Sequence, residues 1–243
     1  MKIPMASAMI KINKKGNIAD IKCFFLKVKV RNYINLFYFN KYFKNVFLLN
    51  KLTSMSHRHF ILHKPYGYLS QFIYELKRKK KLLGELHDFP VGTMAIGRLD
   101  EDSEGLLLLT TDGKMSEIVR SKKVDKEYYV QVDGIITQEA VDQMKKGVEI
   151  GFNGGKYITK PCESFIVNEN PAFGARGKKI RDERHGPTSW ASITVNEGKF
   201  RQVRKMTAAV GFPTLRLVRV RIGNVHLNDL QAGEVREVMG FEL

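Results

Sequence analysis

The sequence predicts an α+β protein whose mixed, largely antiparallel β-sheet carries helices on its faces. From residue 56 onward, strand-like stretches outnumber helical ones. The connections after Gly113 and Gly134 are mostly short, and short connections join antiparallel neighbours. With 243 residues, of which 43% are hydrophobic, the chain is long enough to bury a core.

The first elements follow from local patterns. HFILHKP at 59–65 predicts a strand ended by Pro65, and GLLLLTTDG at 105–113 predicts a buried strand closed by an Asp112-Gly113 turn. KMSEIV at 114–119 predicts a short helix. The Lys/Arg cluster at 77–81 is open to two interpretations, a solvated face or a contact with phosphates.

The later elements alternate between strands and helices. KEYYVQVDG, TSWASITVNEG and LRLVRVRIGNVHL predict strands. TQEAVDQMKKG predicts a helix capped by Thr137 and ended by Gly147, and KFRQVRKMTAAVG predicts a helix ending at Gly211. Residues 168–187 have no apolar period and predict a mobile basic loop, either inert or in contact with RNA.

The net charge of +16 favours an anionic partner, and nucleic acid is the commonest one. Residues 1–54 hold ten lysines and one arginine against a single acid, so they contribute +10 of that charge. Three interpretations of this aromatic-rich extension stay open: an RNA-binding arm, an amphipathic membrane or partner segment, or sequence upstream of a natural start near Met55. We expect 1–54 to be disordered or not native, and 55–243 to be the catalytic domain.

Composition also limits the chemistry. Cys23 and Cys162 fit neither a disulfide framework nor a zinc site, so reduced thiols in a cytosolic protein are expected. No apolar run approaches the ~20 residues of a membrane span. The sequence has no phosphate-cradling glycine loop and no metal-spaced His/Cys set. We therefore expect a cytoplasmic monomer without metal or cofactor.

Four carboxylates crowd positions 100–104 of the stretch GRLDEDSEGLLLLTTDG at 97–113. Asp100 stands apart because Arg98 is close enough to pair with it, whereas Glu101, Asp102 and Glu104 are expected to be solvated loop or turn residues. A paired-carboxylate glycosidase would use Asp100 with Asp102 or Glu104. It would also need a cleft rich in Trp and Tyr, and a chain with one Trp and a large positive charge disfavours it.

Two further stretches contain candidate functional residues. Tyr128 and Tyr129 point to opposite faces of a strand, so one can face a cleft while the other packs, or both can pack. Lys199 gains nothing from the dipole at a helix start, so a carboxylate partner is expected. Val203, Met206, Thr207 and Val210 form a buried helical stripe, which leaves Arg201, Arg204 and Lys205 outside it.

These stretches together resemble the RsuA-type ribosomal branch of the pseudouridine synthases. The resemblance lies in GRLD at 97–100 with SEGLLLLTTDG, KEYYV at 126–130, EGKFRQVRKM at 197–206, GFPTLRLVR at 211–219 and LxxGxxR at 230–236. The motifs keep their order over about residues 57–240, and HKP replaces the usual NKP at 63–65. PTSW at 187–190, and the absence of an S4 RNA-binding domain, look most like the RluE group, which acts on large-subunit ribosomal RNA.

The resemblance implies an isomerase that turns a flipped-out uridine into pseudouridine without a cofactor or metal. It makes Asp100 the catalytic aspartate, Tyr128 the active-site tyrosine and Lys199 the basic residue that pairs with Asp100. Phe200 departs from the usual Asn or His. Arg98, Arg201, Arg204 and Lys205 are the expected RNA contacts. The alternative is a non-catalytic ribosome assembly protein, which would not need Asp100, Tyr128 and Lys199 together.

Overall fold

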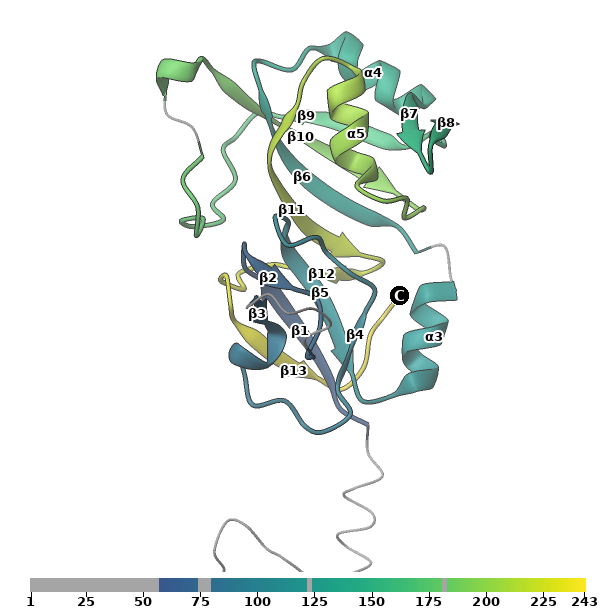
Figure 1. Cartoon of the computed structure of the whole chain (residues 1–243), viewed down its shortest axis with the longest axis vertical. Helices are drawn as coiled ribbons and strands as arrows, with labels where there is room; N and C mark the ends of the chain where they lie inside the picture. Colours follow the sequence, from purple (N-terminus) through teal and green to yellow (C-terminus); the bar gives the residue numbers. More distant parts are fainter. Residues whose placement is uncertain (1–56, 74–79, 122–123, 181–182) are drawn as a thin grey trace, which may run out of the picture. The chain divides into compact units, whose positions relative to one another are not determined.

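The computed structural model describes residues 57–73, 80–121, 124–180 and 183–243 (Figure 1). The predictions for the extension at 1–54, for a start near Met55, for Cys23 and for Lys77–Lys79 of the basic cluster lie outside these residues. Within the described part of the chain, residues His57–Leu243 form one compact unit.

A nine-stranded mixed sheet runs through this unit, counted over the described residues, in the order β13-β1-β5-β11-β6-β10-β9, with β4 on β5 and β12 on β11. All of these neighbours are antiparallel except β5 and β11. The prediction of a largely antiparallel sheet with flanking helices is therefore confirmed. The strands of this sheet are β1 (His59–Lys64), β4 (Met94–Ile96), β5 (Glu104–Thr110), β6 (Lys126–Asp133), β9 (Glu163–Val167), β10 (Thr188–Val195), β11 (Thr214–Ile222), β12 (Val225–His226) and β13 (Val235–Val238).

Three α-helices occur in the described ranges: α3 (Gly113–Ser121), α4 (Gln138–Lys146) and α5 (Gln202–Ala209). As predicted, the Thr137 hydroxyl accepts from the Ala140 amide at the start of α4, and Gly147 ends this helix with φ 99°. The smaller elements are the strand pairs β2 (Tyr68–Leu69) with β3 (Lys81–Leu82) and β7 (Glu149–Phe152) with β8 (Gly155–Ile158), and the 3₁₀ turns Leu83–Glu85 and Glu183–His185. No described helix is long and apolar enough to cross a membrane.

The strand predicted to end at Asp112-Gly113 is β5, which ends at Thr110, and the helix predicted at 114–119 is α3. Gly113 begins α3, and the Asp112 carboxylate accepts a hydrogen bond of 2.9 Å from the Lys114 amide. An Asp that precedes a helix caps its free N–H groups, and Asp-Gly at the end of a strand suits that role as well as a hairpin. The last predicted strand is also interrupted, because Gly223 with φ 55° turns β11 back into β12.

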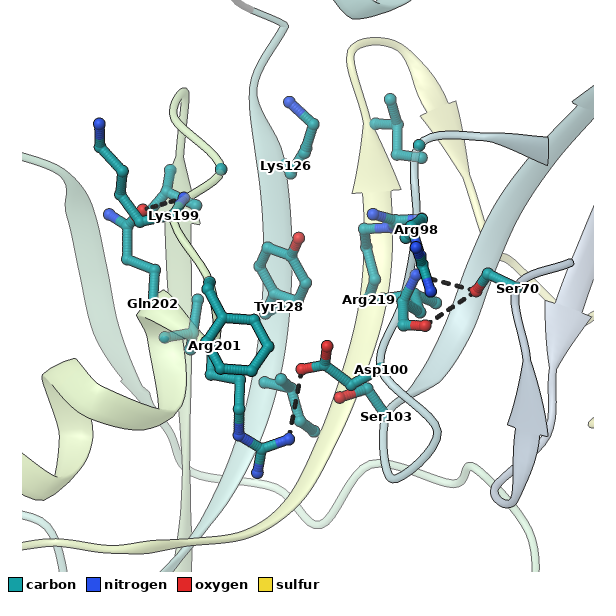
Figure 2. Close-up of a pocket in the computed structure, with 18 of the residues that line it drawn as sticks. Ser70, Arg98, Asp100, Ser103, Lys126, Tyr128, Lys199, Arg201, Gln202 and Arg219 are labelled. Atoms are coloured by element: carbon teal, nitrogen blue, oxygen red, sulfur yellow. Dashed lines mark hydrogen bonds and ion pairs between the residues drawn. The ribbon is translucent and has the colours of Figure 1, made fainter. Parts of the chain in front are cut away.

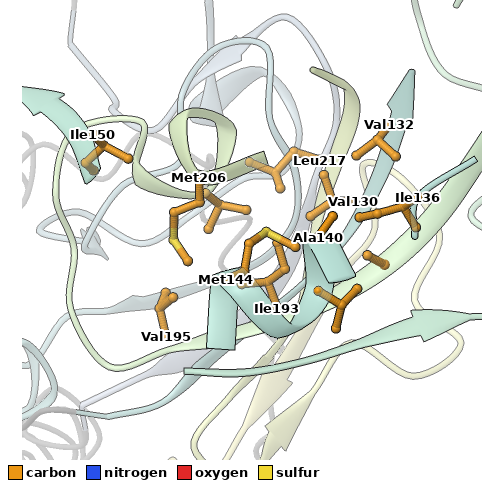
Figure 3. Packing of buried hydrophobic residues seen from close by; sticks show 13 residues of the cluster. Val130, Val132, Ile136, Ala140, Met144, Ile150, Ile193, Val195, Met206 and Leu217 are labelled. Atoms are coloured by element: carbon orange, nitrogen blue, oxygen red, sulfur yellow. The ribbon is translucent and has the colours of Figure 1, made fainter. Parts of the chain in front are cut away.

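Three apolar clusters fill the unit. The largest lies where β6, β10 and β11 pack against α4 and α5, and Met144, Met206 and Ile193 are fully buried in it (Figure 3). The two others lie on either side of β5, whose four leucines Leu106–Leu109 are all buried. The predicted stripe on α5 is confirmed for Val203, Met206 and Thr207. Cys162 is a free thiol, and burial raises its pKa to about 11.

β5 and β11 approach each other unusually closely at Gly105. This glycine has φ 106°, and a Cβ at its position would lie 2.3 Å from the Arg219 carbonyl oxygen and 2.5 Å from the Arg219 nitrogen. Only glycine tolerates both that conformation and that contact. This close contact between β5 and β11 sets the position at which β5 begins. It therefore also sets the position of the loop that precedes β5.

Candidate active site

A cleft of about 850 Å³ opens over β6 and β11, and its volume suits a nucleotide-sized ligand (Figure 2). One wall is the loop between β4 and β5, which carries Asp100. The opposite wall is the segment between β10 and α5, residues 196–201. The two stretches singled out from the sequence, GRLD and EGKFR, therefore face each other across one cavity.

The backbone around Asp100 is held from both sides. The Ser70 hydroxyl donates to the Leu99 carbonyl at 2.8 Å and accepts from the Leu99 amide at 2.9 Å, and both residues are buried. On the other side, the Ser103 amide donates to the Asp100 carbonyl at 3.1 Å. The carboxylate of Asp100 itself stays 35% exposed in the cleft. A fixed backbone with an accessible carboxylate suits a group that must meet a substrate atom.

The cation beside Asp100 is Arg201. Its Nη1 lies 3.4 Å from Asp100 Oδ2, while Nη1 and Nη2 bind both oxygens of Asp102 at 3.0 and 2.9 Å. Arg201 precedes α5 in a left-handed conformation, with φ 53°. Hydrogen bonding to Asp102, and the charges of both aspartates, hold the pKa of Arg201 above its ordinary value. Arg201 thus bridges two carboxylates of the acidic cluster.

Asp102 is not the solvated loop residue that the sequence suggested. Burial alone would raise its pKa, but the hydrogen bond from Arg201 and the charge of Arg204 outweigh burial and leave the pKa lowered. Arg204 also donates from Nη2 to the Asp102 carbonyl at 2.8 Å and to the Ser103 hydroxyl at 3.2 Å. Because its side chain is only 10% exposed, Arg204 faces the acidic loop rather than solvent.

The prediction of solvated carboxylates is also wrong for Glu104. This residue is 1% exposed, and its oxygens bind the guanidinium of Arg216 at 3.1 and 2.7 Å. Arg176 approaches the same carboxylate at 3.1 Å from the basic loop 168–187. Glu101 pairs with Lys80 at 2.8 Å nearer the surface. Sequence spacing could not reveal these partners, because the three basic residues come from distant segments.

Lys199 does not pair with Asp100, contrary to the expectation. Its side chain points away from Asp100, as Figure 2 shows, and Nζ lies 5.0 and 4.6 Å from the ring centroids of Phe152 and Tyr157. The neighbouring Glu197 ties this segment to the same hairpin by accepting from the Tyr157 hydroxyl at 2.6 Å. A cation over aromatic faces is stabilised without a carboxylate.

Tyr128 lines the cleft, and Tyr129 lies on the opposite face of β6 against Phe173, with ring centroids 6.0 Å apart. This is the arrangement in which one tyrosine faces a cleft and the other packs. Figure 2 shows the Tyr128 ring between the wall that carries Asp100 and the wall that carries Lys199. Burial, with the charge of Glu127, raises the pKa of Tyr129.

The cleft also contains cations that the sequence did not single out. Lys126 and Arg219 line it together with Arg98. Burial and the charge of Arg219 lower the pKa of Lys126, and Arg219 is 3% exposed with Nη2 unbonded. Within the described residues, none of these three cations forms an ion pair. The signal was available, because Lys126 lies two residues before Tyr128 and so shares its face of the strand.

Lys205, the last expected RNA contact, is bound within the protein. Its Nζ donates to the Gly151 carbonyl at 2.7 Å and lies 5.4 Å from the Phe200 ring centroid. Of the four residues expected to contact RNA, only Arg98 is without a hydrogen bond or ion pair in the described part of the chain. In the part of the chain that the structure describes, no three His, Cys, Asp or Glu side chains lie close enough together to hold a metal ion.

The mixed sheet and its basic cleft with an accessible aspartate can be compared with known protein families. The family model for RNA pseudouridylate synthases covers residues 58–209, and the chain belongs to that family. The resemblance inferred from the motifs is thereby confirmed, and the chain is an RNA pseudouridine synthase, an isomerase.

The chain is also similar to individual named proteins of this family. The chain is 42% identical over 193 residues to ribosomal large subunit pseudouridine synthase E of Vibrio vulnificus, covering 77% of this chain and 78% of that protein. It is 41% identical to the protein of the same name from Xanthomonas axonopodis pv. citri, covering 70% and 88%. A crystal structure of a pseudouridylate synthase matches with a TM-score of 0.59 and 27% identity, covering 75% of this chain and 70% of that one.

Proposed function

We propose that this enzyme converts a uridine of large-subunit ribosomal RNA into pseudouridine, with Asp100 acting at C1′ of a flipped-out nucleotide. The relatives at 41–42% identity are named for the large ribosomal subunit, which supports this substrate. The observation that carries the catalytic assignment is Asp100, an accessible carboxylate on a doubly anchored loop inside the cleft.

The reaction breaks the N1–C1′ bond of uridine and joins C5 to C1′, while the proton lost from C5 is balanced by one gained at N1. Asp100 must be ionised, whether it attacks C1′ covalently or assists the loss of uracil through a glycal. Arg201, at 3.4 Å, is the cation that orients this carboxylate. Tyr128 is positioned to stack on the uracil or to move a sugar proton.

The target must leave the RNA stack to reach Asp100, which costs a few kcal/mol. Binding of the surrounding phosphates offsets this cost. Arg98, Lys126 and Arg219 supply unpaired positive charge in the cleft for that purpose. All of the proposed groups come from one chain, so we propose that a single copy is active, in the cytoplasm where ribosomes are made.

Asp100→Asn tests the assignment. The amide keeps the shape of the side chain but cannot act as a nucleophile or base, so pseudouridine formation should be abolished. RNA affinity should stay within a few-fold, because Arg201 keeps its two bonds to Asp102. Pseudouridine mapping of ribosomal RNA from cells without the gene, complemented by wild type or variant, gives the first readout, and filter binding gives the second.

Full activity of the Asp100→Asn variant would remove Asp100 from catalysis. Tight RNA binding by a wild-type protein that forms no pseudouridine would instead favour the non-catalytic assembly protein. The same mapping identifies the modified uridine, which either lies in the large subunit or contradicts the proposed substrate.

A further inference from the structure

Phe200 is a large aromatic side chain that the fold leaves 66% exposed. It lines the cleft, on the loop that leads into α5. An aromatic ring of this size normally supplies buried area to a core. Its position is also the one where the sequence departs from the Asn or His usual in the resemblance. Water would solvate a polar side chain at this position, whereas the exposure of an aromatic ring to water is unfavourable.

The loop presents the ring because both neighbours are anchored elsewhere. Lys199 lies over Phe152 and Tyr157, and its amide is bound by Gln202 at 3.1 Å. Arg201 is bound to Asp102. With the residues on either side fixed, the Phe200 side chain lines the cleft and stays largely exposed to solvent.

One cation contacts this ring, and two more basic residues adjoin Phe200 in the sequence. The ammonium of Lys205 lies 5.4 Å from its centroid, held there by the Gly151 carbonyl. Lys199 and Arg201 flank it in the chain. An exposed aromatic among cations is the arrangement that binds unpaired nucleotides, because bases stack on the ring while phosphates meet the charges.

We infer that Phe200 stacks on the nucleobase next to the target uridine. This inference rests on the proposed function, since it requires a flipped nucleotide. When the target leaves the helix, its neighbour loses a stacking partner, and the Phe200 face replaces that partner. The neighbour is the better assignment because the target itself must reach the Asp100 carboxylate, whereas the Phe200 ring is largely exposed to solvent.

The Phe200→Trp variant tests the contact directly. The chain has a single tryptophan, Trp190, which is 6% exposed, so the new indole would be the only accessible one. Stacking quenches indole fluorescence. We expect quenching when a short RNA containing the target binds, and loss of that quenching when one neighbour of the target is made abasic. Quenching that is absent, or lost only when the target base itself is removed, overturns the inference.

Affinity gives an independent measurement in variants that do not depend on Trp. Phe200→Ala and Phe200→Leu should weaken binding of the same RNA about tenfold or more, because a stacked base contributes on that order. Phe200→Tyr should bind like the wild type. Phe165→Ala on β9 is the matched control, since that ring is also 48% exposed but lies outside the cleft, and its affinity should not change.

Two failures remain distinguishable. If the wild type forms pseudouridine and Phe200→Leu binds as tightly as wild type, the stacking contact is wrong and the proposed function stands. If the wild type forms no pseudouridine on any ribosomal RNA, the proposed function fails, and the assignment of a target neighbour fails with it.

Discussion

At the residue scale, the four carboxylates between positions 100 and 104 have four different environments. Asp100 is accessible in the cleft, and Asp102 is bound by Arg201 and Arg204. Glu101 pairs with Lys80 near the surface, and Glu104 is buried against Arg216. Three of the four thus build and anchor the loop that carries the fourth.

Asp102→Asn should lower kcat about tenfold to a hundredfold with little change in KM. The amide keeps one oxygen acceptor but loses the charge and the second bond to Arg201, so Arg201 shifts toward Asp100, and a misplacement of about 1 Å at a reacting group costs this order of rate. Steady-state kinetics on a short RNA substrate measures both constants. Asp229→Asn, in the exposed pair with Arg236, is the control and should react normally. A tenfold to hundredfold rise in KM with kcat unchanged would assign Asp102 to substrate binding instead.

Lys64 is a second unusual residue beside this loop. It is fully buried, and its ammonium donates to the carbonyls of Tyr68 at 2.7 Å and Pro65 at 3.1 Å. Burial lowers its pKa from 10.5 to about 8, although the charges of Glu104, Asp102, Asp100 and Glu101 oppose the shift. The folded protein therefore releases this proton at a lower pH than the unfolded chain does.

This difference predicts a pH-dependent stability. Between pH 8 and 10.5 the unfolded chain holds the Lys64 proton and the folded protein does not, so the free energy of unfolding rises with pH by up to about 3 kcal/mol. Lys64→Met should lack this rise. Urea unfolding at several pH values, followed by Trp190 fluorescence, gives the difference between the two proteins. Parallel pH curves for wild type and variant would contradict it.

At the element scale, the sequence predicted the strands and helices well and their junctions less well. Apolar runs and caps located β1, β5, β6, α4 and β10, because these signals are local. The helix predicted at 114–119 begins one residue earlier, at Gly113, and ends at Ser121. The ion pairs of Asp102 and Glu104 were missed because Arg204 and Arg216 lie 102 and 112 residues away in the sequence.

The candidate site was predictable to a similar degree. Motif resemblance brought Asp100, Tyr128 and the segment 197–206 into one cleft, and the structure contains that cleft. The resemblance did not give the direction of each side chain. Arg201 lies beside Asp100, where Lys199 was expected. Arg201 itself has a left-handed backbone conformation just before α5, and this turns its side chain toward the acidic loop.

Gly105→Ala should be strongly destabilising, by at least about 3 kcal/mol. The methyl group would meet the Arg219 backbone at 2.3 Å at a φ that L-residues rarely adopt, so β5 and β11 would have to separate. Gly92→Ala is the matched control: its φ is 86°, but nothing lies within 4 Å of the new Cβ. It should cost about 1 kcal/mol from backbone strain alone. Equal effects of both substitutions on thermal unfolding would show that the close crossing is unimportant.

At the scale of the whole molecule, positive charge is distributed in two ways. Residues 1–54 contribute +10 of the +16. In the cleft, individual cations line the same cavity as Asp100 at separate, defined positions. A general excess of charge accelerates encounter with RNA and weakens with salt, whereas placed cations select a geometry.

A chain that begins at Met55 should therefore fold and react normally on a short RNA, because the described site is built from residues 69–222. Thermal unfolding and single-turnover rates compare it with the full chain. A large loss of rate would show that residues 1–54 take part in the reaction, and would favour their interpretation as an RNA-binding arm.

The place of β11 in the sheet bears on when activity first arises. β11 joins β5 to β6, yet it is synthesised after both of them and after β10. A nascent chain that has reached β10 therefore holds two sets of strands whose connecting strand has not been made. Asp100 precedes β5 and Arg201 follows β10, so these two residues, 101 apart in the sequence, belong to the two sets of strands that β11 joins. We therefore expect a chain that ends before Thr214, the first residue of β11, to form no pseudouridine.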